Sequence, residues 1–103
     1  MRYCFKFGRG KKVIISGNET FEILGFKVLK EYHISPEHLF CFEFDNGDVT
    51  DSASPLGPIN DGRGNVSIET KINDRNLEIG EAITLVYDYS SDWRKKITLA
   101  GIE

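Results

Sequence analysis

The sequence predicts an α+β fold in which an antiparallel sheet and one main helix pack as two layers. Apolar residues recur at every second position in several short segments, which is typical of strands with one buried face, and at steps of three and four in one segment. The 103 residues, 40% of them hydrophobic, suffice for one core, so we expect a single domain over residues 1–103.

The first two strands are predicted at residues 3–7 and 11–15, in a hairpin closed by the loop Gly8-Arg9-Gly10. Their apolar faces coincide if the loop has an odd number of residues. A three-residue loop pairs Phe7 with Lys11 and places its second glycine where a left-handed conformation is needed.

Residues 20–32 are predicted to form the helix, with Thr20 or Asn18 as its N-cap. Its buried stripe is formed by Phe21, Leu24, Val28 and Tyr32. A glycine inside a helix costs about 1 kcal/mol relative to alanine, so we expect Gly25 to mark close packing on the sheet.

The middle of the chain is predicted from shorter signals. These are a capped single helical turn at residues 35–38, a strand at 39–44, a turn at 45–48, a loop with short strand pairing at 48–65, a strand at 66–72 and a short turn at 77–80. Two final strands then complete the antiparallel sheet.

The last two strands, over residues 82–102, are predicted to close through the loop Ser90-Ser91-Asp92. This register pairs Tyr89 with Trp93, Leu85 with Ile97 and Ile83 with Leu99. Asp92 then takes a left-handed conformation, which aspartate tolerates better than most residues. Asp88 lies opposite Arg94, as a cross-strand charge pair worth about 0.2–1 kcal/mol.

Charge is distributed unevenly along the chain, whose net charge is −3. Residues 1–30 hold seven Lys or Arg and two Glu, which gives +5, whereas residues 31–62 hold seven Asp or Glu and no Lys or Arg, which gives −7. One interpretation is an ordinary mixed surface, because distant segments interleave in a fold. The other is an acidic face for a basic protein partner, formed by Glu43, Asp45, Asp48 and Asp51.

Two basic clusters offer an alternative site, one at the tip of the first hairpin and one on the last strand. They comprise Arg9, Lys11, Lys12, Arg94, Lys95 and Lys96. If the fold brings the clusters together, they form a strip for the phosphates of nucleic acid. The acidic total makes nucleic acid the secondary expectation.

The sequence favours a non-enzymatic protein that needs no cofactor. The pattern G-x-S-x-G and a complete calcium-loop pattern are absent, and the glycine-rich stretches lack the strand-to-helix context of a phosphate loop. The predicted register gives Asp88 an arginine partner and Asp92 a place in the turn, which leaves no carboxylate pair for catalysis. Cys4 and Cys41 have no neighbouring Cys or His at ligand spacing, so we expect free thiols and no metal.

The expected location is the cytoplasm. No segment approaches the about 20 apolar residues that cross a bilayer, and the N-terminus lacks an apolar stretch of signal-peptide length. We expect no membrane contact, and a monomer or weak dimer.

The last hairpin resembles a known family. The stretch Y-D-Y-S-S-D-W-R-K-K-I-T-L resembles the YDFGDDW strand-turn-strand signature of the plasmid pRiA4b ORF-3-like family. The signature turn then comprises Tyr87, Asp88, Asp92 and Trp93. Three more stretches, similar to other family elements and in family order, are V-I-I-S-G-N-E-T-F-E-I-L, H-L-F-C-F-E-F and L-E-I-G-E-A-I-T-L-V-Y-D. The chain departs from the family at Ser90-Ser91, where the family has Gly-Asp, and at Lys11-Lys12, where it has Trp-Arg.

This resemblance implies an α+β domain that travels with mobile elements and has no agreed enzymatic activity. We therefore expect a small binding protein of mobile-element or phage origin. One form of this hypothesis is an anti-CRISPR protein that blocks the surface of a type II RNA-guided nuclease, its acidic face imitating phosphates. The alternative is an accessory domain of a mobile element that contacts nucleic acid through the basic strip.

Overall fold

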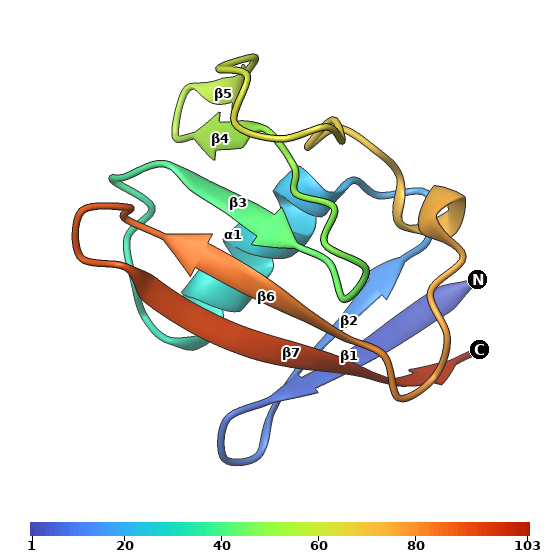
Figure 1. Cartoon of the computed structure of the whole chain (residues 1–103). Helices are drawn as coiled ribbons and strands as arrows, with labels where there is room; N and C mark the ends of the chain where they lie inside the picture. The colour runs from blue at the N-terminus through green and yellow to red at the C-terminus, as the bar shows by residue number, and fades with distance from the viewer.

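Seven strands form one antiparallel sheet in the computed structural model, which describes residues 1–103. The elements in chain order are β1 (Arg2–Phe7), β2 (Lys11–Ser16), α1 (Phe21–Glu31), β3 (Phe40–Glu43), β4 (Ser52–Ser54), β5 (Gly57–Ile59), the 3₁₀ helix η1 (Ile72–Arg75), β6 (Ala82–Tyr87) and β7 (Trp93–Ile102). The order across the sheet is β2-β1-β7-β6-β3-β4-β5 (Figure 1). An antiparallel sheet with one α-helix confirms the predicted α+β class.

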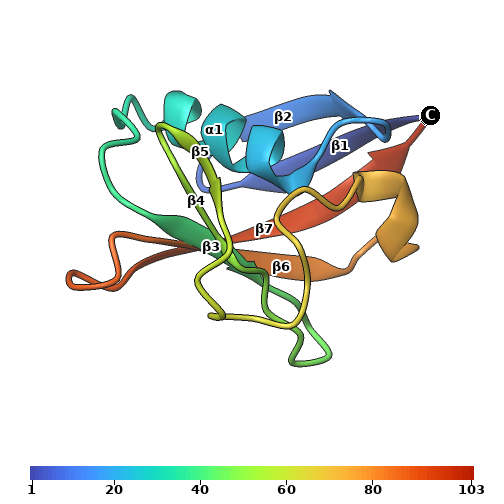
Figure 2. The same cartoon turned by 90° about the horizontal axis from the view of Figure 1, so that it is seen from above.

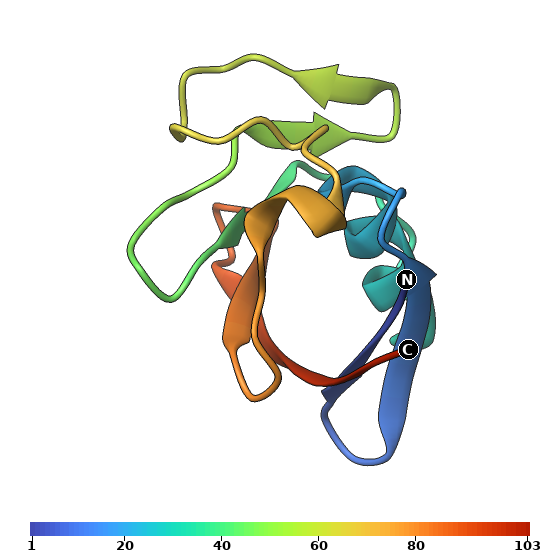
Figure 3. The same ribbon diagram turned by 90° about the vertical axis from the view of Figure 1, so that its right-hand side faces the viewer.

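The sheet curves around α1. The helix packs against both β2 and β3, although β1, β7 and β6 lie between these two strands in the sheet. Figure 3 shows β6, β7, β1 and β2 following an arc, and Figure 2 shows α1 inside the bend. We call the side of the sheet that faces α1 the inner face and the opposite side the outer face.

The core lies between α1 and the inner face of the sheet. Its largest fully buried side chains are Phe5, Phe21, Leu24, Leu29, Phe40, Phe42, Ile68, Ile72, Ile83, Leu85, Ile97 and Leu99. Phe21 stands edge-on to Phe42 and Phe44, with ring centroids 5.8 and 5.2 Å apart. Because burying a side chain of this size contributes about 1.5–3 kcal/mol, this cluster supplies most of the driving force for folding.

The predicted first hairpin is confirmed. Phe7 pairs with Lys11, and the register continues through the pairs Phe5–Val13 and Tyr3–Ile15. Gly10 has a left-handed φ of 68°, and Gly8, with φ 55°, is left-handed as well. The odd loop keeps the apolar residues of both strands buried on the inner face.

The helix is confirmed close to its predicted bounds. Thr20 is its N-cap, and the Thr20 Oγ1 accepts a hydrogen bond of 3.3 Å from the Ile23 N–H. Gly25 is buried, and a Cβ at this position would overlap the ring of Phe40 on β3. Close approach of α1 to the sheet therefore requires the glycine. No helix in the protein has the length and apolar character needed to cross a membrane.

The helical turn predicted at residues 35–38 is wrong. The helix ends at Glu31, and His33 takes a left-handed φ of 56°, which redirects the chain. The Glu37 N–H bonds the carbonyl of Ser35 at 2.8 Å, and no helical turn forms. The chain then enters β3 within the strand predicted at 39–44.

The strand predicted at residues 66–72 is also wrong. This segment makes isolated bridges at Val66 and Lys71, and Ile72 begins η1. The Ile68 N–H donates to the Asp51 carboxylate at 2.7 Å, where a strand would bond a neighbouring backbone. The apolar residues Ile68 and Ile72 of this segment are buried in the core, although the backbone around them is irregular. The strand pairing expected within 48–65 is present as β4 and β5.

The register predicted for the last hairpin is wrong by two residues. Tyr87, and not Tyr89, pairs with Trp93, so the loop has five residues, 88–92. The carbonyl of Asp88 accepts hydrogen bonds of 2.9 Å from the N–H groups of both Ser91 and Asp92, which closes the longer loop. Both loops are odd, so the apolar residues still reach the inner face as predicted.

The cross-strand pair predicted between Asp88 and Arg94 does not form. Arg94 lies opposite Val86, and Asp88 belongs to the loop with a left-handed φ of 54°. The left-handed conformation predicted for Asp92 is confirmed, at φ 52°.

The contact between Gly25 and Phe40 yields the first prediction. Gly25→Ala should destabilise the fold by about 1–3 kcal/mol, because overpacking against the ring outweighs the gain in helix propensity of about 1 kcal/mol. Urea unfolding followed by circular dichroism measures this change. Gly101→Ala is the matched control, because a Cβ there meets nothing within 4 Å. A more stable Gly25→Ala variant would show that Phe40 moves aside at no cost.

Candidate functional site

The acidic residues predicted as a partner-binding face are largely engaged within the protein. Glu43 accepts a hydrogen bond of 2.7 Å from the Arg94 guanidinium. Asp51 accepts the hydrogen bond from the backbone of Ile68 described above. Asp45 is exposed and has no ion pair.

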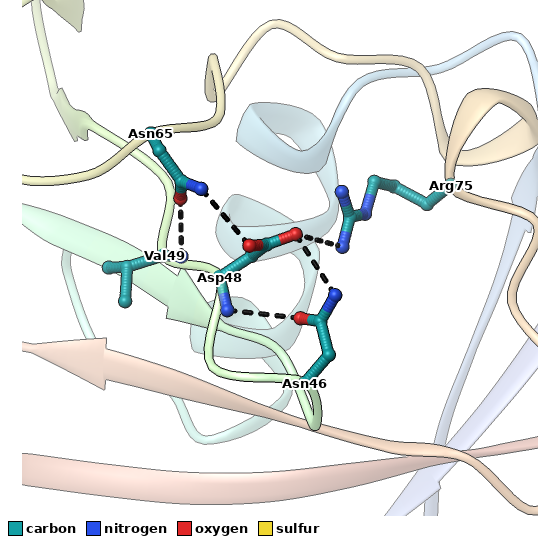
Figure 4. A network of polar contacts seen from close by, with 5 residues as sticks. All are labelled: Asn46, Asp48, Val49, Asn65 and Arg75. Carbon is teal, nitrogen blue, oxygen red and sulfur yellow. Dashed lines mark hydrogen bonds and ion pairs between the residues drawn. The ribbon is translucent and has the colours of Figure 1, made fainter.

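Asp48 is the centre of a polar network (Figure 4). Its carboxylate accepts hydrogen bonds from Asn65 at 3.0 Å, from Asn46 at 3.1 Å and from the Arg75 guanidinium at 3.0 Å. The bonds from Asn65, Asn46 and Arg75, in that order, lower the pKa of Asp48. Arg75 also lies over the ring of Phe44, 4.2 Å from its centroid. The network ties η1 and the 60–65 segment to the turn after β3, so Asp48 serves the fold.

Part of the predicted basic strip comes together, because β1 pairs with β7. Lys6 on β1 lies opposite Thr98 on β7 and, on its other side, opposite Lys12 on β2. Lys11 and Lys95 lie on the inner face and reach the same ring, with their Nζ atoms 5.2 and 5.4 Å from the centroid of Tyr32. The predicted strip is therefore divided between the two faces of the sheet.

The cations at this end have no acidic partner. The ion pairs of the protein involve three of its basic side chains other than histidine: Arg2, Arg75 and Arg94. Lys27 and Lys30 of α1 join Lys12 along a groove between α1 and β2, where Glu31 is the one acid. We call the following set the basic end: Lys6, Arg9, Lys11, Lys12, Lys27, Lys30 and Lys95. Lys96 is not a member, because it lines a groove on the outer face with Glu43 and Asp45.

Sequence reasoning missed three members of the basic end and included two residues, Arg94 and Lys96, that the structure places beside carboxylates. Lys6 could have been found, because the predicted hairpin register already sets it opposite Lys12. Lys27 and Lys30 gave a weaker signal, since their spacing of three places them on one helical face. Arg94 lies between Glu43 and Asp92, and these carboxylates raise its pKa.

The signature turn is mainly structural. The buried Tyr87 donates a hydrogen bond of 2.9 Å to the carbonyl of Ser35 and accepts one of 3.1 Å from the Glu37 N–H, which fixes the chain between α1 and β3. Asp88 is 3.9 Å from His38, and hydrogen bonds from Ser91 and Ser90 lower its pKa.

A second polar cluster lies beside β4. The fully buried Ser52 hydroxyl is 2.6 Å from both the Asp61 carboxylate and the Tyr89 hydroxyl. Arg63 stacks on the Tyr89 ring, 3.4 Å from its centroid, and burial raises the pKa of Tyr89. These groups satisfy one another and hold the 60–65 segment against the sheet.

The two cysteines are free thiols on β1 and β3, which β7 and β6 separate in the sheet. Cys4 is partly buried and Cys41 is buried. No group of three His, Cys, Asp or Glu side chains comes together in an arrangement that could hold a metal ion.

Comparison with known proteins gives a structural neighbour. No family model and no curated protein matches the chain. A crystal structure of a protein of unknown function, MM3350 from Methanosarcina mazei Go1, is similar, with a TM-score of 0.69 and 23% sequence identity. The match covers 97% of this chain and 60% of that chain, so this chain spans about three fifths of the length of its neighbour. At this identity the likeness shows the fold alone.

The Asp48 network predicts a pH dependence. The pKa of Asp48 is lowered in the folded state, so its contribution to stability is present above the ordinary carboxyl pKa of about 3.9 and is lost as the pH falls through the lowered value. Asp48→Asn should therefore lower the melting temperature at neutral pH and flatten its fall in acid. Thermal unfolding at a series of pH values measures both effects.

Asp45→Asn is the matched control, because Asp45 lies in the same turn and has no ion pair. It should follow the unmodified protein at every pH. If the two variants behave alike, the network around Asp48 does not contribute to stability.

Proposed function

We propose that this chain is a non-catalytic binding domain that contacts the phosphates of nucleic acid through its basic end. The observation that carries the proposal is the concentration of seven cations without ion pairs at one end of a protein whose net charge is −3. Contact with nucleic acid, which the sequence analysis gave as the alternative, thus becomes the first proposal.

Physical chemistry supports an anionic partner for this surface. Lysines that outnumber the neighbouring carboxylates raise the local potential, and nucleic acid releases counterions from its phosphates when such a surface binds it. The exposed members of the basic end lie on a hairpin tip, a strand and a helix. Such an open surface suits the extended sugar-phosphate backbone of nucleic acid and not an enclosed small molecule. The proposal also keeps three expectations from the sequence. These are a cytoplasmic location, a two-layer fold and a likeness to the pRiA4b ORF-3-like family.

This proposal predicts a salt-dependent affinity for DNA. Each phosphate contact contributes about 0.9 to the slope of log K against log salt, so Lys12→Glu should weaken binding and reduce the slope by about 1. Fluorescence anisotropy with a labelled duplex at several salt concentrations measures both quantities.

Lys71→Glu is the matched control, because it makes the same charge change at an exposed lysine near the start of α1, away from the hairpin tip. Its affinity should fall much less. Equal losses in both variants would mean that net charge, and not the basic end, governs binding.

Inhibition of a type II CRISPR nuclease by surface blocking stays as a second proposal. The exposed Asp45, which has no ion pair, supports it, and Glu43 lies beside it along a shallow groove. Reversing all four acids of the predicted face would be a poor test, because Asp48 and Asp51 hold the fold together.

A plasmid-cleavage assay with the nuclease and its guide tests this second proposal. The protein at near-equal molar ratio should inhibit cleavage, and Asp45→Lys should relieve the inhibition, whereas Asp74→Lys, at an exposed acid on η1, should not. Adding target DNA before the protein should remove the inhibition if the two compete. Full cleavage in every order of addition, across several nuclease subtypes, would remove this proposal.

A further inference from the structure

Two lysines occupy positions where the strand pattern calls for apolar residues. On β7 the inner face carries Ile97 and Leu99, and Lys95 stands in line with them. On β2 Lys11 stands in line with Val13 and Ile15. A charged residue at such a position lowers the stability of the fold. Departures of this kind are expected where function requires them.

Both lysines meet the ring of Tyr32, which lies at the C-cap of α1. Their Nζ atoms are 5.2 and 5.4 Å from its centroid, and the Lys95 Nζ is also 5.7 Å from the centroid of Trp93. No carboxylate forms an ion pair with either lysine. Two like charges are therefore held around one aromatic ring without a counterion, and an anion is the natural complement.

The aromatic part of this site is built on a fixed base. Tyr32 stands edge-on to Trp93 at 5.4 Å between centroids and tilts against Phe7 at 5.7 Å, and Trp93 stands edge-on to Tyr87 at 6.1 Å. Phe7 and Tyr87 are buried, whereas Tyr32 and Trp93 are half-buried and reach solvent. The two outer rings are thus held in place by the two inner ones.

The hydroxyl of Tyr32 is also unusual. It is buried and has no hydrogen-bond partner in the protein. It lies against the hairpin tip, where a Cβ at Gly8 would come within 2.8 Å of it, so a side chain at this position would displace the ring. A buried polar group without a partner in the protein costs stability.

We propose that the ring of Trp93, held edge-on by Tyr32 and flanked by Lys11 and Lys95, stacks on an unpaired base while the lysines hold its phosphates, so that the basic end prefers single-stranded nucleic acid to duplex. Aromatic rings beside a basic surface are how proteins bind single strands without sequence preference. In a duplex the base faces are already stacked and are closed to the protein. This inference rests on the proposed binding of nucleic acid and names the class of strand.

Trp93 is the sole tryptophan, so its fluorescence reports on this site. The protein is titrated at low salt with an unlabelled oligothymidylate and, separately, with a duplex that carries the same number of phosphates. The single strand should quench Trp93 and bind about tenfold more tightly than the duplex, since base stacking adds to the phosphate contacts.

Two variants separate phosphate contact by the lysines from a structural role of the same residues. Lys11→Met and Lys95→Met keep the apolar stem and remove the charge, and each should weaken binding of the single strand several-fold without lowering the melting temperature. Lys71→Met, at an exposed lysine away from the basic end, should leave both affinities unchanged. A lower melting temperature with unchanged binding would show that the lysines serve the fold, and would overturn the inference.

The titrations also separate this inference from the function on which it rests. Equal affinities for single strand and duplex, with unquenched Trp93, would overturn the preference for single strands and leave phosphate binding in place. Absence of binding to both would overturn the proposed function together with the inference.

Discussion

The pairing of β1 with β7 is the constraint on which the rest of the structure depends. It joins the first and last strands of the chain side by side within the sheet, and the N–H and carbonyl groups of Arg2 and Glu103 bond each other at 3.0 and 2.8 Å. Each of these strands then carries a hairpin partner outward, β2 on one side and β6 on the other. The same pairing sets the tip of the first hairpin beside the start of β7, and so creates the basic end.

Local sequence patterns predicted the elements whose geometry is decided locally. The first hairpin follows from alternation and from the parity of its loop, because both glycines of Gly8-Arg9-Gly10 favour the tight turn. The last hairpin has the same parity with three or five loop residues, and alternation cannot distinguish these. The longer loop is selected by the carbonyl of Asp88, which bonds two N–H groups, and such a contact leaves no trace in the apolar pattern.

The candidate site was harder to predict than the fold, because ion pairing is decided by contacts between distant segments. Residues 31–62 contain no Lys or Arg, which suggested free acids. Arg75 and Arg94, from the last third of the chain, reach back to Asp48 and Glu43 and neutralise them. The basic strip was partly visible in the sequence, and its division between two faces follows from alternation, which a register shift of two residues leaves unchanged. The residues that lie opposite one another depended on the register of β7, which alternation left open by two residues.

The ion pairs are unevenly distributed over the protein. They leave one end basic although the net charge of the chain is −3. The pairs that form in the middle and at the chain ends use the guanidinium groups of Arg2, Arg75 and Arg94, and none uses a lysine. Guanidinium suits such fixed pairing because its planar fork matches a carboxylate, whereas a lysine ammonium is a mobile point charge. The arginines are thus largely bound into the fold and the lysines of the basic end remain free. Under the proposed function, a polyanion would be attracted by the basic end and repelled by the acidic remainder, so the charge distribution would orient it before any specific contact is made.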